Sequence, residues 1–592
     1  MAKTHPRNTY RVDETLEEPF NLRHLLRAGS YIKKYGKKMI LALTLSIFGA
    51  MAALCAPKIT KEALDVVIPA KDKAGLNRLL LLLILAYGIS ILFFTIRQHI
   101  MERTSQDIVY DIRKDLFAHL QKLPFQYYDD RPHGKILIRV VNYVNSVCDM
   151  LSNGLINAIL EIINLIFIVI FMFTTDVKLS LVVITGVPVL AVFLFWIKAH
   201  QRKAWRLVSN KNSNLNAYLQ ENIVGAKITQ IFAREEENAA IFEDLSNDCR
   251  KTWMGAVRYT NSVWPGIDSI SVFVRGAILV VGLLLFVEGQ ETLGAIVAIS
   301  SYASRFWQPI MNLGNIFNNF INNMAYLERI FETIDEPVEI KDKEGATDIG
   351  RIKGEVEFQH VSFSYEEGKE VLHDVSFKVR PGQSIALVGP TGAGKSTIVS
   401  LISRFYNLDS GKILIDGQDI SEVTLRSLRS QMGIMLQDSF IFSGTIEDNI
   451  RYGKLDATSE EIKKASATVC ADAFISKMPK GYMTEVKERG STLSQGQKQL
   501  ISFARTLLSD PALLVLDEAT SSIDVQTERA LQKGLDAMLK GRTSFIIAHR
   551  LSTIKNCDQI MYIDHGGITE AGTHEELMAK KGQYYHLYMS QL

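Results

Sequence analysis

The second half of the chain contains Gly389-Pro390-Thr391-Gly392-Ala393-Gly394-Lys395-Ser396. This octapeptide fits the pattern G-x-x-x-x-G-K-[ST], follows the apolar run 384–388 and precedes a helical pattern that begins at Thr397. A strand, a glycine-rich turn and a helix cradle a nucleotide triphosphate, because backbone N–H groups close around phosphate oxygens at the helix N-terminus. We expect Lys395 to reach the β- and γ-phosphates and the Ser396 hydroxyl to bind Mg²⁺.

Composition separates the chain into two unlike halves. Its 592 residues are too many for one ordinary core; long apolar runs fill the first half, and short β-like runs alternate with amphipathic helices in the second. The net charge is only +2 and the basic residues are dispersed, which argues against nucleic acid as the main partner. The five cysteines are widely spaced and form no C-x-x-C pair, so we expect neither a disulfide framework nor a metal site.

Six apolar runs approach the roughly 20 residues that a helix needs to cross a bilayer. They are residues 39–59, 76–97, 155–174, 179–198, 270–287 and 293–313. Lysine and arginine are concentrated before the first run, after the second and after the fourth, whereas the turn between the fifth and sixth has Glu288 and Glu291 and no basic residue. The positive-inside rule then predicts that both termini and the nucleotide loop are cytoplasmic.

The basic segments 98–154 and 199–269 are long and mostly compatible with helix. Folded as hairpins with a rise of about 1.5 Å per residue, they would reach roughly 35–40 Å from the bilayer. That distance would bring them to a cytoplasmic domain.

Upstream of the first run, apolar residues between Phe20 and Ile32 alternate with lysine and arginine, which favours either a helix on the membrane surface or a solvated lead-in. The acidic N-terminus does not fit a cleaved leader.

An acidic pair follows an apolar run typical of a buried parallel strand. Asp517 ends the run 512–516, and Glu518 comes directly after it. We expect Asp517 to hold Mg²⁺ and Glu518 to orient and deprotonate an attacking water. An acidic pair after an apolar strand is not by itself specific for catalysis. The phosphate loop in the same chain is what points to a catalytic role for this pair.

Two further polar residues stand at predicted strand ends. His549 closes the apolar run 544–548, and Gln437 follows the run 434–436. Ligands collect at the carboxyl edge of a parallel sheet, so His549 is placed to hydrogen-bond the γ-phosphate and Gln437 to reach Mg²⁺ and water. The alternatives are a structural histidine and an exposed loop amide.

The stretch Leu493-Ser494-Gln495-Gly496-Gln497 resembles the signature motif of ATP-binding cassette proteins. Tyr365 matches the aromatic residue that stacks on adenine in that family, and residues 521–524 resemble the loop that communicates across its nucleotide dimer. The resemblance implies ATP and Mg²⁺ as cofactors. It implies a nucleotide site made by Tyr365, Gly389, Pro390, Thr391, Gly392, Ala393, Gly394, Lys395, Ser396, Thr397, Gln437, Ser494, Gly496 and Gln497, with Glu518, His549 and Gln437 catalytic and Ser396, Gln437 and Asp517 at the metal.

Six spans ahead of one cassette resemble a half-transporter of the bacterial multidrug and lipid exporter type. The implied fold is an all-α six-helix transmembrane domain with long cytoplasmic extensions, followed by an α/β P-loop ATPase with an antiparallel β subdomain and a helical subdomain. The expected domains are the N-terminal arm 1–38, the transmembrane domain 39–330, a linker 331–350 and the nucleotide-binding domain 351–592. Residues 117–134 and 225–235 resemble the coupling regions, and 484–490 resembles the exporter loop.

In that family two cassettes close head to tail, so Ser494 and Gly496 would serve the partner's nucleotide. Two positions depart from the family's pattern, because Gln495 and Lys487 each stand where a glycine is common. Both departures leave the catalytic groups in place. The partner is therefore either an identical chain or a different half-transporter, and Gln495 favours the heterodimer.

The sequence as a whole indicates an ATP-driven exporter that moves an amphipathic drug, lipid or peptide by alternating access across a bacterial plasma membrane. The alternative is an ATP-gated membrane sensor or channel; a soluble cassette ATPase is excluded by the apolar spans.

Charged residues within spans are energetically costly to place in a bilayer and therefore point to a functional role. Glu161, Arg275 and Arg305 therefore either contact cargo or form ion pairs and snorkelling contacts.

Overall fold

The computed structural model describes residues 22–129, 131, 133–366, 368–435, 439–517, 525–547 and 551–590. The chain divides into two compact units. The first, which we call the helical unit, spans Met1–Leu120 and His133–Asp335, and the second, the α/β unit, spans Gln121–Pro132 and Glu336–Leu592. Residues 121–132, which interrupt the helical unit, thus pack with the second half of the chain.

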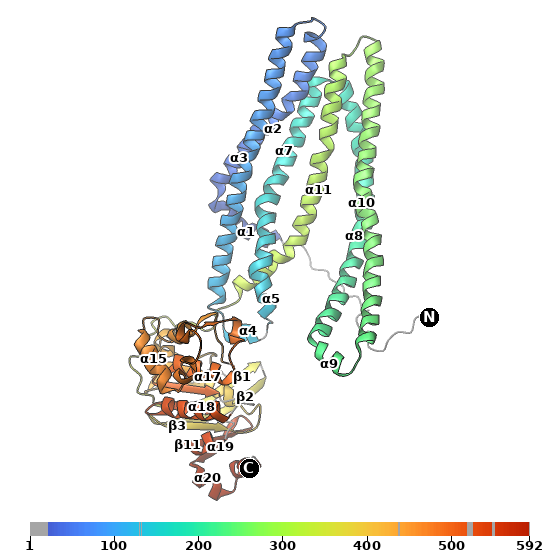
Figure 1. Cartoon of the computed structure of the whole chain (residues 1–592). Coiled ribbons are helices and arrows are strands. Elements are labelled where there is room, and N and C mark those ends of the chain that lie inside the picture. The colour runs from blue at the N-terminus through green and yellow to red at the C-terminus, as the bar shows by residue number, and fades with distance from the viewer. Residues whose placement is uncertain are drawn as a thin grey trace. The chain divides into compact units, whose positions relative to one another are not determined.

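Long helices build the helical unit (Figure 1). They are α2 (Gly36–Glu62), α3 (Lys73–Leu120), α7 (Leu155–Thr175), α8 (Val177–Val224), α10 (Glu235–Val287) and α11 (Leu293–Asp335). Each predicted span lies within one of them. Among the described helices, α2 with its π-helical extension η1 (Ala63–Val67), α3, α7, α8 and α10 are long and apolar enough to cross a membrane. The sixth predicted span lies in α11, where Arg305 and Gln308 interrupt the apolar run, and stays a prediction.

The surface of the helical unit is unusually apolar. On α3, α8 and α10, side chains such as Leu81, Phe195 and Phe273 are 68%, 81% and 79% exposed. Extended apolar surface of this kind would be a liability in water and matches a surface that faces lipid. The interior is filled by close-packed residues such as Met172, Leu179 and Tyr302, which are fully buried.

Both predicted helical hairpins are present. α8 and α10 lie side by side and continue past the predicted spans to the short helix α9 (Ala226–Ile231) at their end (Figure 1). In the other hairpin, α3 continues to Leu120 and is followed by α4 (Phe125–Asp129), after which the chain returns through α5 (His133–Ile138), η2 (Arg139–Tyr143), α6 (Val144–Asp149) and η3 (Met150–Gly154) into α7.

The segment before the first span forms a helix, α1 (Leu22–Lys34), and Phe20 lies outside the described residues. Its polar side chains and those just after it pair with one acidic face of α3. Tyr31 donates to Asp115 at 3.1 Å, Lys34 to Asp111 at 2.6 Å, and Lys38 to Asp107 at 2.9 Å. Because Asp107, Asp111 and Asp115 recur every four residues, they share one side of α3. Two successive contacts therefore attach α1 to α3, and Lys38, at the start of α2, adds the third contact of the row.

The described residues of the α/β unit form three sheets. The six-stranded sheet has the order β12-β11-β3-β10-β9-β6, in which all neighbours except the β11–β12 pair are parallel. Its strands are β3 (Ser384–Val388), β6 (Met432–Met435), β9 (Leu513–Asp517), β10 (Thr543–Ile547), β11 (Gln559–Asp564) and β12 (Gly567–Gly572). The parallel strands β3, β9 and β10 are almost completely buried, as continuous apolar runs require.

The other two sheets are antiparallel. One has the order β2-β1-β4-β5 and comprises β1 (Val356–Glu366), β2 (Lys369–Val379), β4 (Ser410–Ile415) and β5 (Gln418–Asp419); the other pairs β7 (Gly444–Thr445) with β8 (Glu485–Val486). The helices are α12 (Lys395–Ile402), α13 (Leu425–Arg429), α14 (Ile446–Arg451), α15 (Ser459–Thr468), α16 (Asp472–Ile475), α17 (Gln495–Leu508), α18 (Val525–Leu539), α19 (Leu551–Lys555), α20 (His574–Lys580) and α21 (Gln583–Ser590), with the 3₁₀ turns η4 (Gly481–Met483) and η5 (Glu488–Gly490). An α/β core with an antiparallel subdomain and a helical subdomain is what the sequence predicted.

Candidate functional site

The predicted phosphate loop joins β3 to α12, and its glycines adopt conformations that other residues avoid. Gly389 has φ 143° and Gly394, the residue that caps α12, has φ 102°. A Cβ added at Gly389 would lie 2.0 Å from the carbonyl oxygen of Ile563, and one at Gly394 would lie 2.7 Å from the Leu372 side chain. The backbone can pass through this turn only without side chains, which leaves its N–H groups accessible to an anion.

Lys395 begins α12 and is only 9% exposed. Its Nζ donates to the carbonyl oxygens of Gly389 and Pro390 at 2.9 and 2.7 Å, so the ammonium group is held over the loop. Burial lowers the pKa of Lys395, and the nearby carboxylate of Asp517 opposes that shift. The charge that would meet a phosphate is therefore positioned by the loop itself.

Strand register places Asp517 at the edge of the sheet where the loop begins. Ile547 on β10 pairs with Asp517 on β9 and also with Leu387 on β3, so the three strands end together. Glu518, Gln437 and His549, and also residues 521–524, lie outside the described residues. The strands that precede the first three residues, β9, β6 and β10, are consecutive neighbours in the sheet, in the order β10-β9-β6.

Mg²⁺ fits the donors that this edge provides. The Ser396 hydroxyl stands in the first turn of α12, and the Asp517 carboxylate lies close enough to Lys395 to interact with it electrostatically. Hydroxyl and carboxylate oxygens are the hard donors that Mg²⁺ prefers, and Mg²⁺ is usually bound by one or two carboxylates together with substrate phosphates.

Tyr365 lies near the end of β1 in an aromatic group with Phe363 and Tyr406. The ring centroids of Tyr365 and its neighbours are 4.8 and 5.1 Å apart, both in edge contacts, and the Tyr365 hydroxyl donates to Thr397 Oγ1 at 3.2 Å. Burial raises the pKa of Tyr365. The residue remains 38% exposed, so a ring fixed through its edges can still offer surface to a planar base.

Ser494 caps α17, the helix that follows the signature stretch. Its Oγ accepts from the Gln497 backbone N–H at 3.3 Å, and the Gln497 side chain accepts from the Ser494 N–H at 3.0 Å. Gly496 is buried, whereas Gln495 and Lys487 are exposed. The side chains that replace the two expected glycines therefore fit without displacing the helix start.

Helix α4 packs beside the Tyr365 group; the sequence predicted that this hairpin reaches a cytoplasmic domain but did not identify the residues that it contacts. The rings of Phe125 and Phe405 are 4.3 Å apart, and the Tyr406 hydroxyl donates to Asp129 at 3.0 Å. Gln126 donates to the carbonyl oxygen of Tyr365 at 3.5 Å. Helix α4 thus contacts the same strand and loop that carry the predicted adenine-stacking residue.

Known families match both halves of the chain. The family model of the ABC transporter transmembrane region matches residues 39–310, and the ABC transporter model matches residues 372–521, which include the phosphate loop and the signature stretch. The chain belongs to the ABC transporter family.

Relatives extend this similarity along the whole chain. The ABC transporter ATP-binding protein YknV of Bacillus subtilis is 41% identical over 584 residues, which cover 98% of this chain and 97% of that protein. The fatty acid ABC transporter ATP-binding/permease protein of Mycobacterium bovis is 36% identical over 523 residues, 88% of this chain and 83% of that protein. The ATP-bound structure of a bacterial Atm1-family ABC exporter has a TM-score of 0.78 at 30% identity and covers 94% of this chain and 98% of its own.

These similarities establish the class of activity. The chain is a multi-pass ABC half-transporter that hydrolyses ATP to drive export and works as a dimer. The predictions of a fused membrane and ATPase chain, of an exporter and of coupled ATP hydrolysis are confirmed, and the sensor or channel alternative is not favoured.

The helical unit of this ABC exporter contains a cavity of about 510 Å³ between α2, α3, α7 and α11. Glu161, a residue that the sequence singled out, lines it, while neither Arg275 nor Arg305 is among the described residues that do. Sequence reasoning missed Arg97 and five asparagines at 157, 164, 312, 315 and 319. The helical spacing of 157, 161 and 164 and of 312, 315 and 319 is the signal that could have revealed them.

Arg305 has a different environment. Its Nη1 donates to the carbonyl oxygen of Ala53 at 3.0 Å, and its Nη2 donates to the Tyr87 hydroxyl at 3.2 Å. These contacts join α11 to α2 and α3. They favour the structural alternative for Arg305 over a contact with cargo.

Proposed function

We propose that this ABC exporter takes an amphipathic substrate from the cytoplasm or inner leaflet of a bacterial plasma membrane and releases it outward, with both termini cytoplasmic. The basic residues that surround the predicted cytoplasmic ends of the spans support this orientation. The fatty acid transporter among the relatives acts on an amphiphile, which supports a cargo of the same general kind.

At each nucleotide site, the proposed roles follow from where the residues stand. Lys395 binds the β- and γ-phosphates, the backbone between Gly389 and Thr397 surrounds them, and Tyr365 stacks on adenine. Ser396, Asp517 and Gln437 hold Mg²⁺, which supplies positive charge near the phosphates when bound. Glu518 takes the proton of the attacking water, and His549 donates a hydrogen bond to the γ-phosphate.

The partner chain completes the site. Ser494, Gly496 and Gln497 form the start of α17, a helix of 14 residues whose N-terminal N–H groups and dipole suit a γ-phosphate that is held by the opposite phosphate loop. A homodimer contains every catalytic residue type, and the exposed Gln495 keeps a heterodimer with a second half-transporter as the favoured alternative. Cross-linking of two differently tagged copies of this chain distinguishes the two.

Exposed apolar residues supply a contact for that partner. In α9 and directly after it, Ile228, Ile231 and Phe232 are 62%, 77% and 70% exposed at the tip of the second hairpin. In the α/β unit, Phe440 and Tyr452 are 54% and 60% exposed and belong to an aromatic cluster with Arg505. We assign the α9 tip of each chain to the aromatic cluster of the other, since both would otherwise expose apolar surface to water.

The observation that carries the proposal is that Lys395 and Asp517 meet at one sheet edge in the same chain as an apolar helical bundle. The test is uptake of labelled amphiphiles by inside-out vesicles. We expect ATP-dependent accumulation, and none with a Lys395→Ala chain. Passive flux that ATP merely switches on, with no accumulation against a gradient, would instead support a gated channel.

A further inference from the structure

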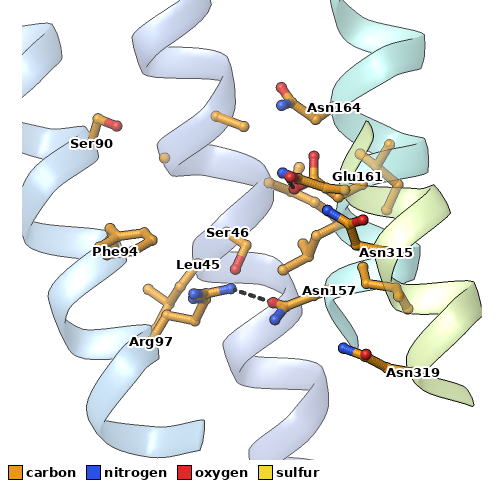
Figure 2. A pocket seen from close by; sticks show the side chains of 17 residues that line it. Leu45, Ser46, Ser90, Phe94, Arg97, Asn157, Glu161, Asn164, Asn315 and Asn319 are labelled. Atoms are coloured by element: carbon orange, nitrogen blue, oxygen red, sulfur yellow. Dashed lines mark hydrogen bonds between the residues drawn. The ribbon is translucent and has the colours of Figure 1, made fainter. Parts of the chain in front are cut away.

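We propose that the cavity between α2, α3, α7 and α11 binds the zwitterionic head group of the exported amphiphile, with its anionic part on Arg97 and its ammonium on Glu161 (Figure 2). The inference rests on the proposed export function and names its substrate class.

Arg97 and Glu161 are the charged residues among the described residues of the cavity. Isolated charges are expensive within a membrane bundle and are retained where they pair or bind a ligand. Within the part of the chain that the structure describes, none of the ion pairs joins these two side chains to each other. The two charges lie near enough to interact electrostatically without forming a direct ion pair, so neither is fully compensated by the other.

Arg97 is held in place but has donors to spare. Its Nη1 donates to Asn157 Oδ1 at 3.1 Å, as the dashed line in Figure 2 marks, and its Nη2 donates to Gln98 at 3.1 Å. The guanidinium carbon lies 4.9 Å from the centroid of the Phe94 ring. Its Nε is buried without a hydrogen-bond partner. A fixed guanidinium with unused N–H groups matches the geometry of a phosphate or carboxylate.

Glu161 is oriented from the other side of the cavity. Its Oε1 accepts from the Asn312 amide at 2.6 Å, and Asn312 is itself fixed because its Oδ1 accepts from Gln308 at 3.1 Å. The amide can therefore only donate to Glu161. A carboxylate held in this way retains acceptor sites for the N–H groups of an ammonium.

The balance of charge selects a zwitterion over a simple ion. In a medium of low dielectric, an anionic head on Arg97 would be repelled by Glu161, and a cationic head on Glu161 would be repelled by Arg97. A head group with both charges satisfies both side chains. Asn315, Asn319 and Asn164, which extend the polar lining, supply amide donors and acceptors for its remaining oxygens.

The depth of the cavity agrees with a lipid-like substrate. Arg97 ends the second predicted span, Glu161 is in the first two turns of α7, and Asn312 is the penultimate residue of the sixth predicted span. In the proposed orientation all three lie near the cytoplasmic ends of their spans, where inner-leaflet head groups reside. Apolar side chains such as Leu45, Ile163 and Ile316 complete the lining and suit the first methylenes of a tail.

The test measures binding without nucleotide, by native mass spectrometry of the purified full-length protein. The probes share one dodecyl chain and differ in the head: lysophosphatidylethanolamine is zwitterionic, lysophosphatidic acid anionic, dodecylamine cationic and monododecanoylglycerol neutral. We expect the zwitterion to bind about tenfold more tightly than each of the others, or about 1.4 kcal/mol. A lipoamino acid, 2-aminotetradecanoate, distinguishes a carboxylate zwitterion from a phosphate one. Equal affinities for the four dodecyl probes would overturn the inference.

Matched variants identify the side chains. Arg97→Gln should weaken both phosphate probes about tenfold and leave dodecylamine unchanged, while Glu161→Gln should weaken the zwitterion and dodecylamine and spare lysophosphatidic acid. Arg103→Gln and Glu102→Gln, exposed positions of the same helix α3, are the controls. If Arg97→Gln behaves like Arg103→Gln, the assignment is wrong. Wild-type selectivity decides the question even if a variant does not fold.

Two outcomes separate this inference from the proposed function. ATP-dependent uptake of some amphiphile into vesicles, without preferential binding of a zwitterion, would reject the head-group site and leave export intact. Selective binding of the zwitterion without uptake of any probe would support the site and reject the proposed export of an amphiphile.

Discussion

Arg305 donates a 3.0 Å hydrogen bond to the backbone carbonyl oxygen of Ala53, a contact between residues 252 positions apart. Pro57 lies inside α2, four residues after Ala53, and has no N–H with which to close the helical bond to that carbonyl. A group that proline leaves without its helical partner is thus satisfied from another helix. At the adjacent residue, Tyr302 donates to the carbonyl oxygen of Leu54 at 2.7 Å, so α11 is bonded to α2 at two consecutive carbonyls.

Replacement of Arg305 by alanine should destabilise the helical unit by about 1–3 kcal/mol, because the half-buried carbonyl of Ala53 loses its hydrogen-bond partner. Restoring the N–H at position 57 should compensate, since a Pro57→Ala chain can close the helical bond itself. We therefore expect the unfolding midpoint of the double variant to exceed that of Arg305→Ala alone. A double variant no more stable than the single one would contradict the role given to the proline.

The same double variant tests whether Arg305 also contacts the transported substrate. If Arg305 acts only through α2, the stimulation of ATPase activity by a transported amphiphile should be normal once stability is restored. A persistent loss of stimulation in the Pro57→Ala, Arg305→Ala chain would show that the guanidinium touches substrate after all.

Helix α4 should transmit nucleotide state to the membrane, because it packs on the aromatic group around Tyr365. Asp129→Asn weakens the acceptor of the Tyr406 hydroxyl, and Tyr406→Phe removes the donor of the same 3.0 Å bond. We expect either change to lower transport per ATP hydrolysed by about fivefold while ATPase activity persists. Vesicle uptake and phosphate release, measured on the same preparation, give this ratio.

A double-mutant cycle is the control for that prediction. If Asp129 and Tyr406 act through one bond, the combined variant should be no worse than either single change. Additive losses would indicate two independent effects and would remove α4 from the proposed coupling route.

The nucleotide half of the molecule was predictable because its signals are local. An apolar run, a glycine turn and a helical pattern stand next to one another around residues 384–402, and β3 and α12 form there. Long-range contacts were beyond the same reasoning. Nothing near Phe125 or Asp129 in the sequence identifies Phe405 and Tyr406 as their partners, because the fold brings them together from about 280 residues away.

The membrane half shows a second limit. Apolarity identifies the spans, and the charged residues within them stand out as exceptions. Amide side chains escaped that reasoning, although Asn157, Asn312, Asn315 and Asn319 face the same cavity as Glu161. The sequence singles out Arg305 by its charge. Its structural role, however, is to bind the carbonyl oxygen of Ala53, which lacks a helical partner because Pro57 has no N–H.

Glu518→Gln should retain ATP binding and lose most turnover. The substitution keeps the size of the side chain and removes the base that takes the proton of water, a contribution worth about 10²-fold or more. We expect nucleotide to be trapped in the purified dimer, and radiolabelled ATP retained after desalting measures it. Hydrolysis near the wild-type rate would reject the role given to Glu518. Asp536→Asn, a carboxylate on α18 whose Oδ1 accepts from Gln532, is a control within the same unit.

The turn between α7 and α8 and the turn between α10 and α11 contact each other in a way that depends on pH. Glu291 precedes α11, and its side chain hydrogen-bonds to Asp176, the residue that caps α8. This bond, then burial, then the negative charge of Asp176 raise the pKa of Glu291 from 4.5 to about 7, while Lys178 and Lys61 oppose the shift. The folded state therefore prefers the protonated carboxyl group. Its stabilising contribution is complete below pH 4.5 and is lost as the pH rises through about 7.

A Glu291→Gln chain should remove this dependence, since the amide donates to Asp176 at every pH. Unfolding midpoints measured between about pH 5 and pH 8 should converge for the two proteins at the acidic end and diverge toward the alkaline end, with the variant more stable. Glu288→Gln, in the same turn, controls for a simple change in net charge. A difference between Glu291→Gln and wild type that stays constant across the range would mean that the two carboxyl groups do not share a proton.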